Sequence, residues 1–256
     1  MDYKTIKYDE HEKVGTITLN RPEKRNAINE CMIEELVDCI NCCGEHEDIR
    51  AIILTGGGKA FCSGGDIVET PPPRAKKFLN ALHSAFLEIR RVPKPVIAAV
   101  NGPAIGGGFA LALACDIIIA SRSARFNSHY VLIGVSPDCG MSYMLPRLLG
   151  DKRATWLMFT GEMVDAQKGY EMGFVNRVVE DDQLLNETNL IAKRLAESAT
   201  LAIARTKDLI NRSWHESLET QMEYEKQLFG CLARMEDHNE AITAFREKRK
   251  PKFKGG

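Results

Sequence analysis

The sequence lacks a long hydrophobic run. Its most apolar stretches are Val96 to Val100 and Phe109 to Cys115, and Asp116 interrupts the second. A membrane-spanning helix needs about 20 apolar residues, so the sequence predicts none. The N-terminal segment lacks the apolar core of a signal peptide and is too acidic for a typical transit peptide. We therefore expect a cytoplasmic protein that associates with no membrane.

The sequence also lacks an excess of charge of either sign. Its 34 basic and 35 acidic side chains leave a net charge of -1, which argues against a protein that coats nucleic acid. The eight cysteines do not form two CxxC motifs and have no histidine partner at zinc-finger spacing, so we expect no metal site. The length of 256 residues allows one large domain or two small ones.

The hydrophobic pattern of the first 120 residues alternates between strands and helices. Apolar or period-two segments predict strands at 5–8, 14–19, 51–54, 96–100 and 117–120, and helical periodicity falls at 29–43, 74–91 and 109–115. This alternation predicts an α/β fold with a sheet covered on both faces. Residues beyond 150 read as helices at 151–159, 165–172, 181–198, 200–213, 215–232 and 236–246. We expect an α/β core over 1–198 and a helical C-terminal region over 199–256.

Two glycine-rich segments directly follow predicted strands. They are 60–67 (AFCSGGDI) and 101–108 (NGPAIGGG), and the second opens a helix. The N-terminus of a helix offers free N–H groups, and glycine lets a ligand oxygen reach them. Tight turns are the alternative interpretation. Neither segment matches GxGxxG or a P-loop, so a nucleotide site is not predicted.

Further motifs stand in order around these two segments. They are Leu19 to Ala27 (LNRPEKRNA), Cys115 to Ile117, Thr160 to Glu162 and Gly173 to Val175. Over essentially the whole chain this set resembles the enoyl-CoA hydratase/isomerase (crotonase) superfamily. The resemblance implies a spiral of ββα repeats, a C-terminal trimerisation region, and a homotrimer or homohexamer that binds an acyl-CoA thioester. It implies no separate cofactor, because coenzyme A is part of the substrate.

The resemblance also assigns site residues. The backbone N–H groups of Gly65 and Gly107 would form an oxyanion hole for the thioester oxygen. Substrate-binding positions would be Arg25, Ala27, Ala60, Ser63, Asp66, Ile67 and Tyr130. Phe253 and Lys254, in the basic tail 246–254, would reach the phosphate end of coenzyme A, often across a subunit boundary. A solvated basic tail is the alternative.

The proton-transfer residues depart from the hydratase pattern. Family hydratases use two glutamates, and the matching positions here are Ala110 and Tyr130. Asp138 lies where several isomerases place a single catalytic acid and where aromatic-CoA dehalogenases place a nucleophile, although an Asp in a turn or at the cap of the helix 141–149 is the alternative. One carboxylate suits a proton shift along the acyl chain. We therefore expect an enoyl-CoA isomerase, with a hydratase, another lyase or hydrolase, or a non-catalytic member left open.

Four other residues carry weaker expectations. His83 lies on an apolar helix face and is predicted to be a packed histidine. Leu87 stands where the dehalogenases have their catalytic histidine, which argues against dehalogenation. Glu69 is predicted to be a solvated loop carboxylate, with a second catalytic acid as the alternative. The role of His129 stays open.

Overall fold

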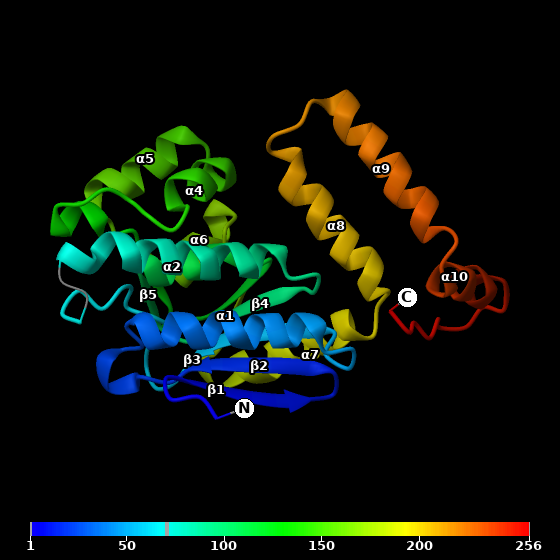
Figure 1. Cartoon of the computed structure of the whole chain (residues 1–256), viewed down its shortest axis with the longest axis horizontal. Coiled ribbons are helices and arrows are strands. Elements are labelled where there is room, and N and C mark those ends of the chain that lie inside the picture. The colour runs from blue at the N-terminus through cyan, green and yellow to red at the C-terminus, as the bar shows by residue number, and fades with distance from the viewer. Residues whose placement is uncertain (1, 70–71, 256) are drawn as a thin grey trace.

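The main sheet contains six strands in the order β1-β2-β3-β4-β6-β9 (Figure 1). A computed structural model describes residues 2–69 and 72–255. The strands are β1 (Ile6–His11), β2 (Val14–Leu19), β3 (Ala51–Gly56), β4 (Val96–Val100), β6 (Ile117–Ser121) and β9 (Arg177–Val179). β1 and β2 form an antiparallel hairpin whose turn residues, Glu12 and Lys13, both take positive φ, and each later pair is parallel.

A second layer of short strands follows the main sheet. It contains β5 (Pro103–Ile105), β7 (Arg125–Asn127) and β8 (Val164–Asp165). β5 pairs with β7, and single bridges join Cys62 to Ala104 and Ile28 to Gly65. Each central strand of the main sheet is thus followed by a short pairing segment and a helix, which confirms the expected spiral of ββα repeats. The sequence pattern missed β5, β7, β8 and β9, because strands of two or three residues show no readable period.

Three helices cover one face of the main sheet. They are α1 (Glu30–Glu45), α2 (Pro72–Arg91) and α3 (Gly107–Ala114), and α1 and α2 lie side by side. Asn29 caps α1 because its side-chain oxygen accepts a hydrogen bond of 3.0 Å from the Met32 N–H. α2 begins at Pro72, before the expected Arg74, since proline is tolerated in the first turn of a helix. The apolar faces of these helices bury the larger hydrophobic core.

The opposite face of the main sheet is covered by α7 (Leu184–Ala196). Leu184 and Ala192 pack there against Ile53, Ile97 and Ile119 in a second hydrophobic cluster. β3 and β4 are buried at every position because helices lie on both sides of them. This arrangement confirms the α/β class predicted from the continuous apolar strands.

The remaining elements lie near the short strands and in the C-terminal region. Near the short strands lie η1 (Pro22–Lys24), η2 (Tyr130–Ile133), α4 (Met141–Leu149), α5 (Asp151–Thr160) and α6 (Ala166–Met172), and η3 (Asp181–Gln183) precedes α7. The helices α8 (Thr200–Ser213), α9 (Leu218–Leu232) and α10 (Glu236–Arg246) project from the core (Figure 1). None of the described helices is both long and apolar enough to cross a bilayer.

Arg50 joins the core to the C-terminal region. Its buried guanidinium donates hydrogen bonds to the carbonyl of Ser198 (2.7 Å), the hydroxyl of Thr200 (3.1 Å) and the carbonyl of Phe253 (3.0 Å). α9 buries none of its residues and exposes Leu218, with 70% of its surface accessible. The helical region is therefore tied to the core at its base by Arg50 and along α8 by residues such as Lys207, whereas α9 is open along its length.

Candidate active site

A cavity of about 560 Å³ lies where the two glycine-rich segments meet. Its walls come from these segments, from the N-terminal half of α2 and from the loop 129–138. The lining residues are Ala27, Ser63, Gly64, Gly65, Asp66, Ile67, Phe78, Leu79, Leu82, Ile105, Gly106, Gly107, His129, Tyr130, Ile133, Val135, Ser136 and Asp138. Most of these side chains are apolar, so the polar groups stand out as candidates for chemistry.

Asn26 fixes the first glycine-rich segment. It is fully buried in the left-handed region, with φ of +56°. Its side-chain amide donates to the carbonyls of Gly57 (2.9 Å) and Ala60 (2.8 Å), and its side-chain oxygen accepts from the Arg21 N–H (3.0 Å). Because these partners are all main-chain groups, Asn26 sets the backbone path that leads to Gly65. The sequence motif marked this residue but gave no sign of its role.

Asp66 lines the cavity, but its carboxylate is already engaged. One oxygen lies 3.1 Å from the Arg21 guanidinium, and the other accepts from the Val68 and Glu69 N–H groups. Burial raises the pKa of Asp66, but these hydrogen bonds and the charge of Arg21 outweigh it and hold the pKa below its usual range. The Asp66 carboxylate therefore shapes the loop, and the binding of substrate at this position stays a prediction.

Glu69 is the second partner of this arginine. Its carboxylate lies 2.6 Å from Arg21 and accepts a hydrogen bond of 2.8 Å from the Asn29 side chain. It does not line the cavity. The expectation of a solvated loop carboxylate is therefore only half right, since Glu69 is half-exposed but ion-paired, and the alternative of a second catalytic acid is not supported.

Gly65 and Gly107 bring two backbone N–H groups together. Gly107 is the first residue of α3, and a Cβ placed on it would lie 3.6 Å from the Gly65 nitrogen. Neither N–H has a hydrogen-bond acceptor within residues 2–69 and 72–255. The positive φ of Gly64 (+95°) and Gly106 (+52°) turns the chain just before each donor. Two free donors that face one cavity have the form of an oxyanion hole.

Gly108 explains why the two segments lie so close. A Cβ on Gly108 would lie 2.1 Å from the Cys62 carbonyl oxygen, far inside van der Waals contact. Only glycine at this position lets α3 pack against the segment that carries Gly65. Cys62 itself is fully buried, and burial raises the pKa of its thiol to about 12, so it is an inert packing residue.

Asp138 and Tyr130 form a hydrogen-bonded pair in the cavity wall. The Tyr130 hydroxyl donates to the Asp138 carboxylate across 2.6 Å. Burial first, and then the charge of Asp138, raise the pKa of Tyr130 well above its ordinary value, so the phenol remains a donor. Asp138 does not cap α4 through its side chain, because Gly140 is the N-cap residue and no side chain caps that helix. The Met141 N–H donates to the Asp138 carbonyl at 3.0 Å, so Asp138 opens a turn, as one alternative expected, but it does not cap the helix.

Asp138 is the carboxylate left free in the cavity. Asp66 and Asp138 are the acidic residues among the described lining residues, and Asp66 is paired with Arg21. Asp138 forms no ion pair with any described residue. Ala110, the position of the first hydratase glutamate, is fully buried inside α3. The cavity thus combines two N–H donors with one free carboxylate.

Some of the predicted binding residues line the cavity and others do not. Ala27, Ser63 and Ile67 line it, as expected. Arg25 and Ala60 do not: Arg25 is exposed, with its carbonyl accepting from the Ser63 N–H at 3.0 Å, and Ala60 is buried in the turn that Asn26 holds. His129 lines the cavity with a strained φ of +59°, and its role stays open.

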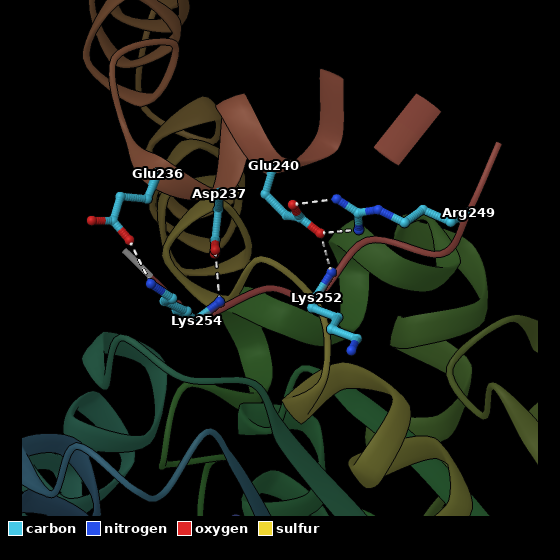
Figure 2. A pocket seen from close by; sticks show the side chains of 6 residues that line it. All are labelled: Glu236, Asp237, Glu240, Arg249, Lys252 and Lys254. Atoms are coloured by element: carbon cyan, nitrogen blue, oxygen red, sulfur yellow. Dashed lines mark hydrogen bonds and ion pairs between the residues drawn. The ribbon is translucent and has the colours of Figure 1, made fainter. Parts of the chain in front are cut away.

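The C-terminal tail lies on α10, away from the cavity within one chain (Figures 1 and 2). Arg249 donates to Glu240 at 2.9 Å, and the Lys254 ammonium lies 3.1 Å from Glu236. The hydrogen bonds from Arg249, and then the one from the Lys252 N–H, lower the pKa of Glu240 to about 2. Figure 2 shows that the Lys252 side chain points away from the acids, while its N–H donates to Glu240. Phe253 and Lys254 therefore do not complete the cavity of their own chain.

His83 and Leu87 lie beside the cavity in a different setting from the one predicted. Both side chains are exposed and line a second cavity of about 420 Å³, so the expectation of a packed histidine is wrong. The Nε2 atom of His83 accepts from the Cys139 N–H at 3.3 Å. Sequence reasoning missed this cavity because α8, which forms one wall of it, lies about 100 residues further along the chain than α2.

Comparison with known proteins agrees with this geometry. Residues 9–256 match the family model described as enoyl-CoA hydratase/isomerase. The 1,2-epoxyphenylacetyl-CoA isomerase of Escherichia coli K12 is 36% identical over 252 residues, covering 94% of this chain and 95% of the relative. The short-chain-enoyl-CoA hydratase of Clostridium acetobutylicum is 37% identical over 254 residues, covering 98% and 97%.

Solved structures give the same result for the fold. A crystal structure of an enoyl-CoA hydratase from Bacillus anthracis superposes with a TM-score of 0.96 at 33% identity, covering 99% of this chain and all of the other. The chain therefore belongs to the enoyl-CoA hydratase/isomerase family and is an enzyme of that family with the crotonase fold.

Proposed function

We propose that this protein isomerises an enoyl-CoA by moving a proton along the acyl chain. The observation that carries the proposal is the single free carboxylate, Asp138, in a cavity with the N–H groups of Gly65 and Gly107. One of the relatives is named as an isomerase of an acyl-CoA, which supports the same class of reaction.

The reaction would proceed in two proton transfers. With a 3-enoyl-CoA, Asp138 removes a proton from C2, and the electron pair delocalises onto the thioester oxygen as a dienolate. The Gly65 and Gly107 N–H groups stabilise that negative charge, and each such donor contributes about 3 to 4 kcal/mol in enzymes where one has been removed. Asp138 then returns the proton to C4, which leaves the double bond between C2 and C3.

Tyr130 would position the base. Its hydrogen bond of 2.6 Å engages one oxygen of Asp138 and restricts rotation of the carboxylate. The phenol stays protonated throughout, so it orients Asp138 without competing for the transferred proton.

Hydration of an enoyl-CoA is the second candidate. Several relatives, including the Clostridium acetobutylicum protein, are named as hydratases. Addition of water requires a group that positions the water as well as one that moves its proton. Since Asp66 is ion-paired and Ala110 carries no carboxylate, the described site offers one free carboxylate where the family hydratases use two, and isomerisation fits it better.

We also propose a homotrimer or homohexamer in which 199–256 forms the trimerisation region. α9 exposes Leu218, Met222 and Phe229 along a helix that buries nothing within the chain, which supports burial against a partner. In such an assembly Phe253 and Lys254 would serve the coenzyme A of a neighbouring chain. Sedimentation or light scattering tests this, and a monomer at micromolar concentration would refute it.

Product analysis tests the reaction class. A 3-enoyl-CoA is incubated in deuterated water with the wild type and with Asp138→Asn, and the product is analysed by mass spectrometry. We expect a 2-enoyl-CoA without added water from the wild type, and at least a hundredfold slower turnover with unchanged acyl-CoA binding in the variant. A 3-hydroxyacyl-CoA formed at full rate by the variant would refute both the reaction and the residue.

A further inference from the structure

The second cavity lies against the first but has a different chemical character. Its volume is about 420 Å³, and its walls come from the second half of α2, the start of α4 and the end of α8. The lining residues are His83, Phe86, Leu87, Arg90, Arg91, Ala114, Cys139, Gly140, Tyr143, Met144, Asn211, Trp214 and His215. The mechanism proposed above uses none of them.

The two cavities share their dividing wall. Asp138 lines the first cavity and Cys139 the second, while Leu82 lines the first and His83 the second. The wall is closed by the hydrogen bond of 3.3 Å from the Cys139 N–H to His83. The second cavity therefore begins directly behind the wall that carries Asp138, and an acyl chain enters it where the contact between Cys139 and His83 opens.

The second cavity is cationic at its far end. Its described lining includes Arg90 and Arg91, and no aspartate or glutamate. Arg90 is held by the Asn211 side chain, and its guanidinium lies 5.5 Å from the centre of the Trp214 ring. Arg91 is mostly exposed and lies 3.7 Å from Glu88, outside the cavity. An anion in this cavity would find positive charge without a competing carboxylate in the wall.

The middle of the second cavity is apolar and aromatic. Phe86, Leu87 and Met144 line it, and the Tyr143 and His215 rings stack with their centres 5.6 Å apart. Leu82 and Arg90 are eight residues apart on α2, which corresponds to about 12 Å along the helix. The path from Asp138 therefore runs first along apolar side chains and ends at guanidinium groups.

We infer that the second cavity binds the far end of the substrate acyl group and that this end carries a carboxylate. The inference rests on the proposed function, because it extends the same acyl site. A neutral alkyl end would remove water from Arg90 without replacing its hydrogen bonds, which opposes binding. A carboxylate replaces that water with charged hydrogen bonds.

Matched substrates test the inference. Two enoyl-CoA substrates of equal chain length are compared, one ending in a carboxylate and one ending in the corresponding methyl ester. The enzymes are the wild type, Arg90→Gln, Arg91→Gln and the control Arg205→Gln, which changes an exposed arginine of α8 that lines neither cavity. The measurement is kcat/KM for each pair, with circular dichroism to confirm folding.

The expected result is a selective loss. Wild type and Arg205→Gln should prefer the carboxylate by at least tenfold, and Arg90→Gln should lose most of that preference while it keeps its rate on the ester. Arg91→Gln should lose part of it, and this exposed position reports on the inference even if Arg90→Gln fails to fold. Equal rates on both substrates in the wild type, or an unchanged preference in both variants, would overturn it. Failure of the proposed function looks different, since then the wild type isomerises neither substrate.

Discussion

Alanine substitutions at two adjacent glycines at the start of α3 should differ in their effect on folding stability. A Cβ on Gly107 would lie 3.6 Å from the Gly65 nitrogen and 3.7 Å from the Gly64 Cα, which is ordinary contact. Gly107→Ala should therefore fold, and its stability should stay equal or rise by about 0.5 to 1 kcal/mol, because alanine favours a helix over glycine. An oxygen that accepts from Gly65 must lie about 2.9 Å from the same nitrogen, so the new methyl competes with it for space.

The expected kinetic cost follows from the loss of one oxyanion donor. That loss corresponds to about 2.7 to 4 kcal/mol, or a decrease of roughly 100-fold to 1,000-fold in kcat. The assay is turnover of whichever enoyl-CoA the wild type converts, with thermal unfolding measured on the same samples. A Gly107→Ala protein with wild-type kcat would refute the assignment of these two N–H groups.

Gly108→Ala is the matched control at the neighbouring position. Its Cβ would lie 2.1 Å from the Cys62 carbonyl oxygen and 2.7 Å from the Cys62 carbonyl carbon, and both are backbone atoms that cannot rotate away. Forced overpacking costs about 1 to 3 kcal/mol, and more where the backbone must shift. Each kcal/mol lowers Tm by about 2–4 °C in a protein of this size. A Gly108→Ala protein as stable as the wild type would show that the two segments are not packed as described.

Three further outcomes follow from contacts elsewhere. Tyr130→Phe removes the hydrogen bond of 2.6 Å to Asp138, so kcat should fall about tenfold or more with little change in KM; an equal kcat would contradict the positioning role. Arg50→Met leaves three carbonyl or hydroxyl acceptors unpaired, so limited proteolysis should cut 199–255 faster while the core stays protected. An equal increase in the cleavage rate of both parts would contradict the role of Arg50 in joining them. The pKa of Glu240 lies at about 2 in the folded chain against an ordinary 4.5, so its support of the tail is complete above about pH 4.5 and is lost as the pH falls toward 2. Protection of the Lys252 N–H from hydrogen exchange should fall over this pH range in the wild type and should not change with pH in Glu240→Gln. Protection that does not change with pH in the wild type would contradict this role of Glu240.

The main strands and most of the helices could be predicted from the sequence because each of them repeats its pattern over many residues. β3 and β4 are apolar at nearly every position, because helices bury both of their faces. A continuous apolar sequence of this kind predicts a strand that is buried on both faces. α1 shows its cap at Asn29 and its apolar stripe in the same way. The short strands β5, β7 and β8 form only because neighbouring repeats stack, and stacking is a long-range property.

The sequence predicted the backbone groups of the candidate site better than the contacts that its side chains make. Gly65 and Gly107 lie together in the cavity, as the glycine pattern and the resemblance indicated. Asp66 lines the cavity, but the sequence did not predict that its carboxylate pairs with Arg21, from a motif 45 residues earlier in the chain. His83 was expected to be packed, but it faces a cavity whose other wall is α8. Partners that arrive from distant segments are fixed by the tertiary fold, and local spacing does not encode them.

The use of main-chain N–H groups at Gly65 and Gly107 has a consequence for how such a protein changes over time. No exchange of a side chain at Ala110, Tyr130 or Asp138 deletes either donor, because those positions lie on other parts of the backbone. Under the proposed function, the groups that hold the thioester oxygen are therefore separate from the groups that move protons. A substitution at Ala110, Tyr130 or Asp138 would then change how protons move and leave both N–H donors in place.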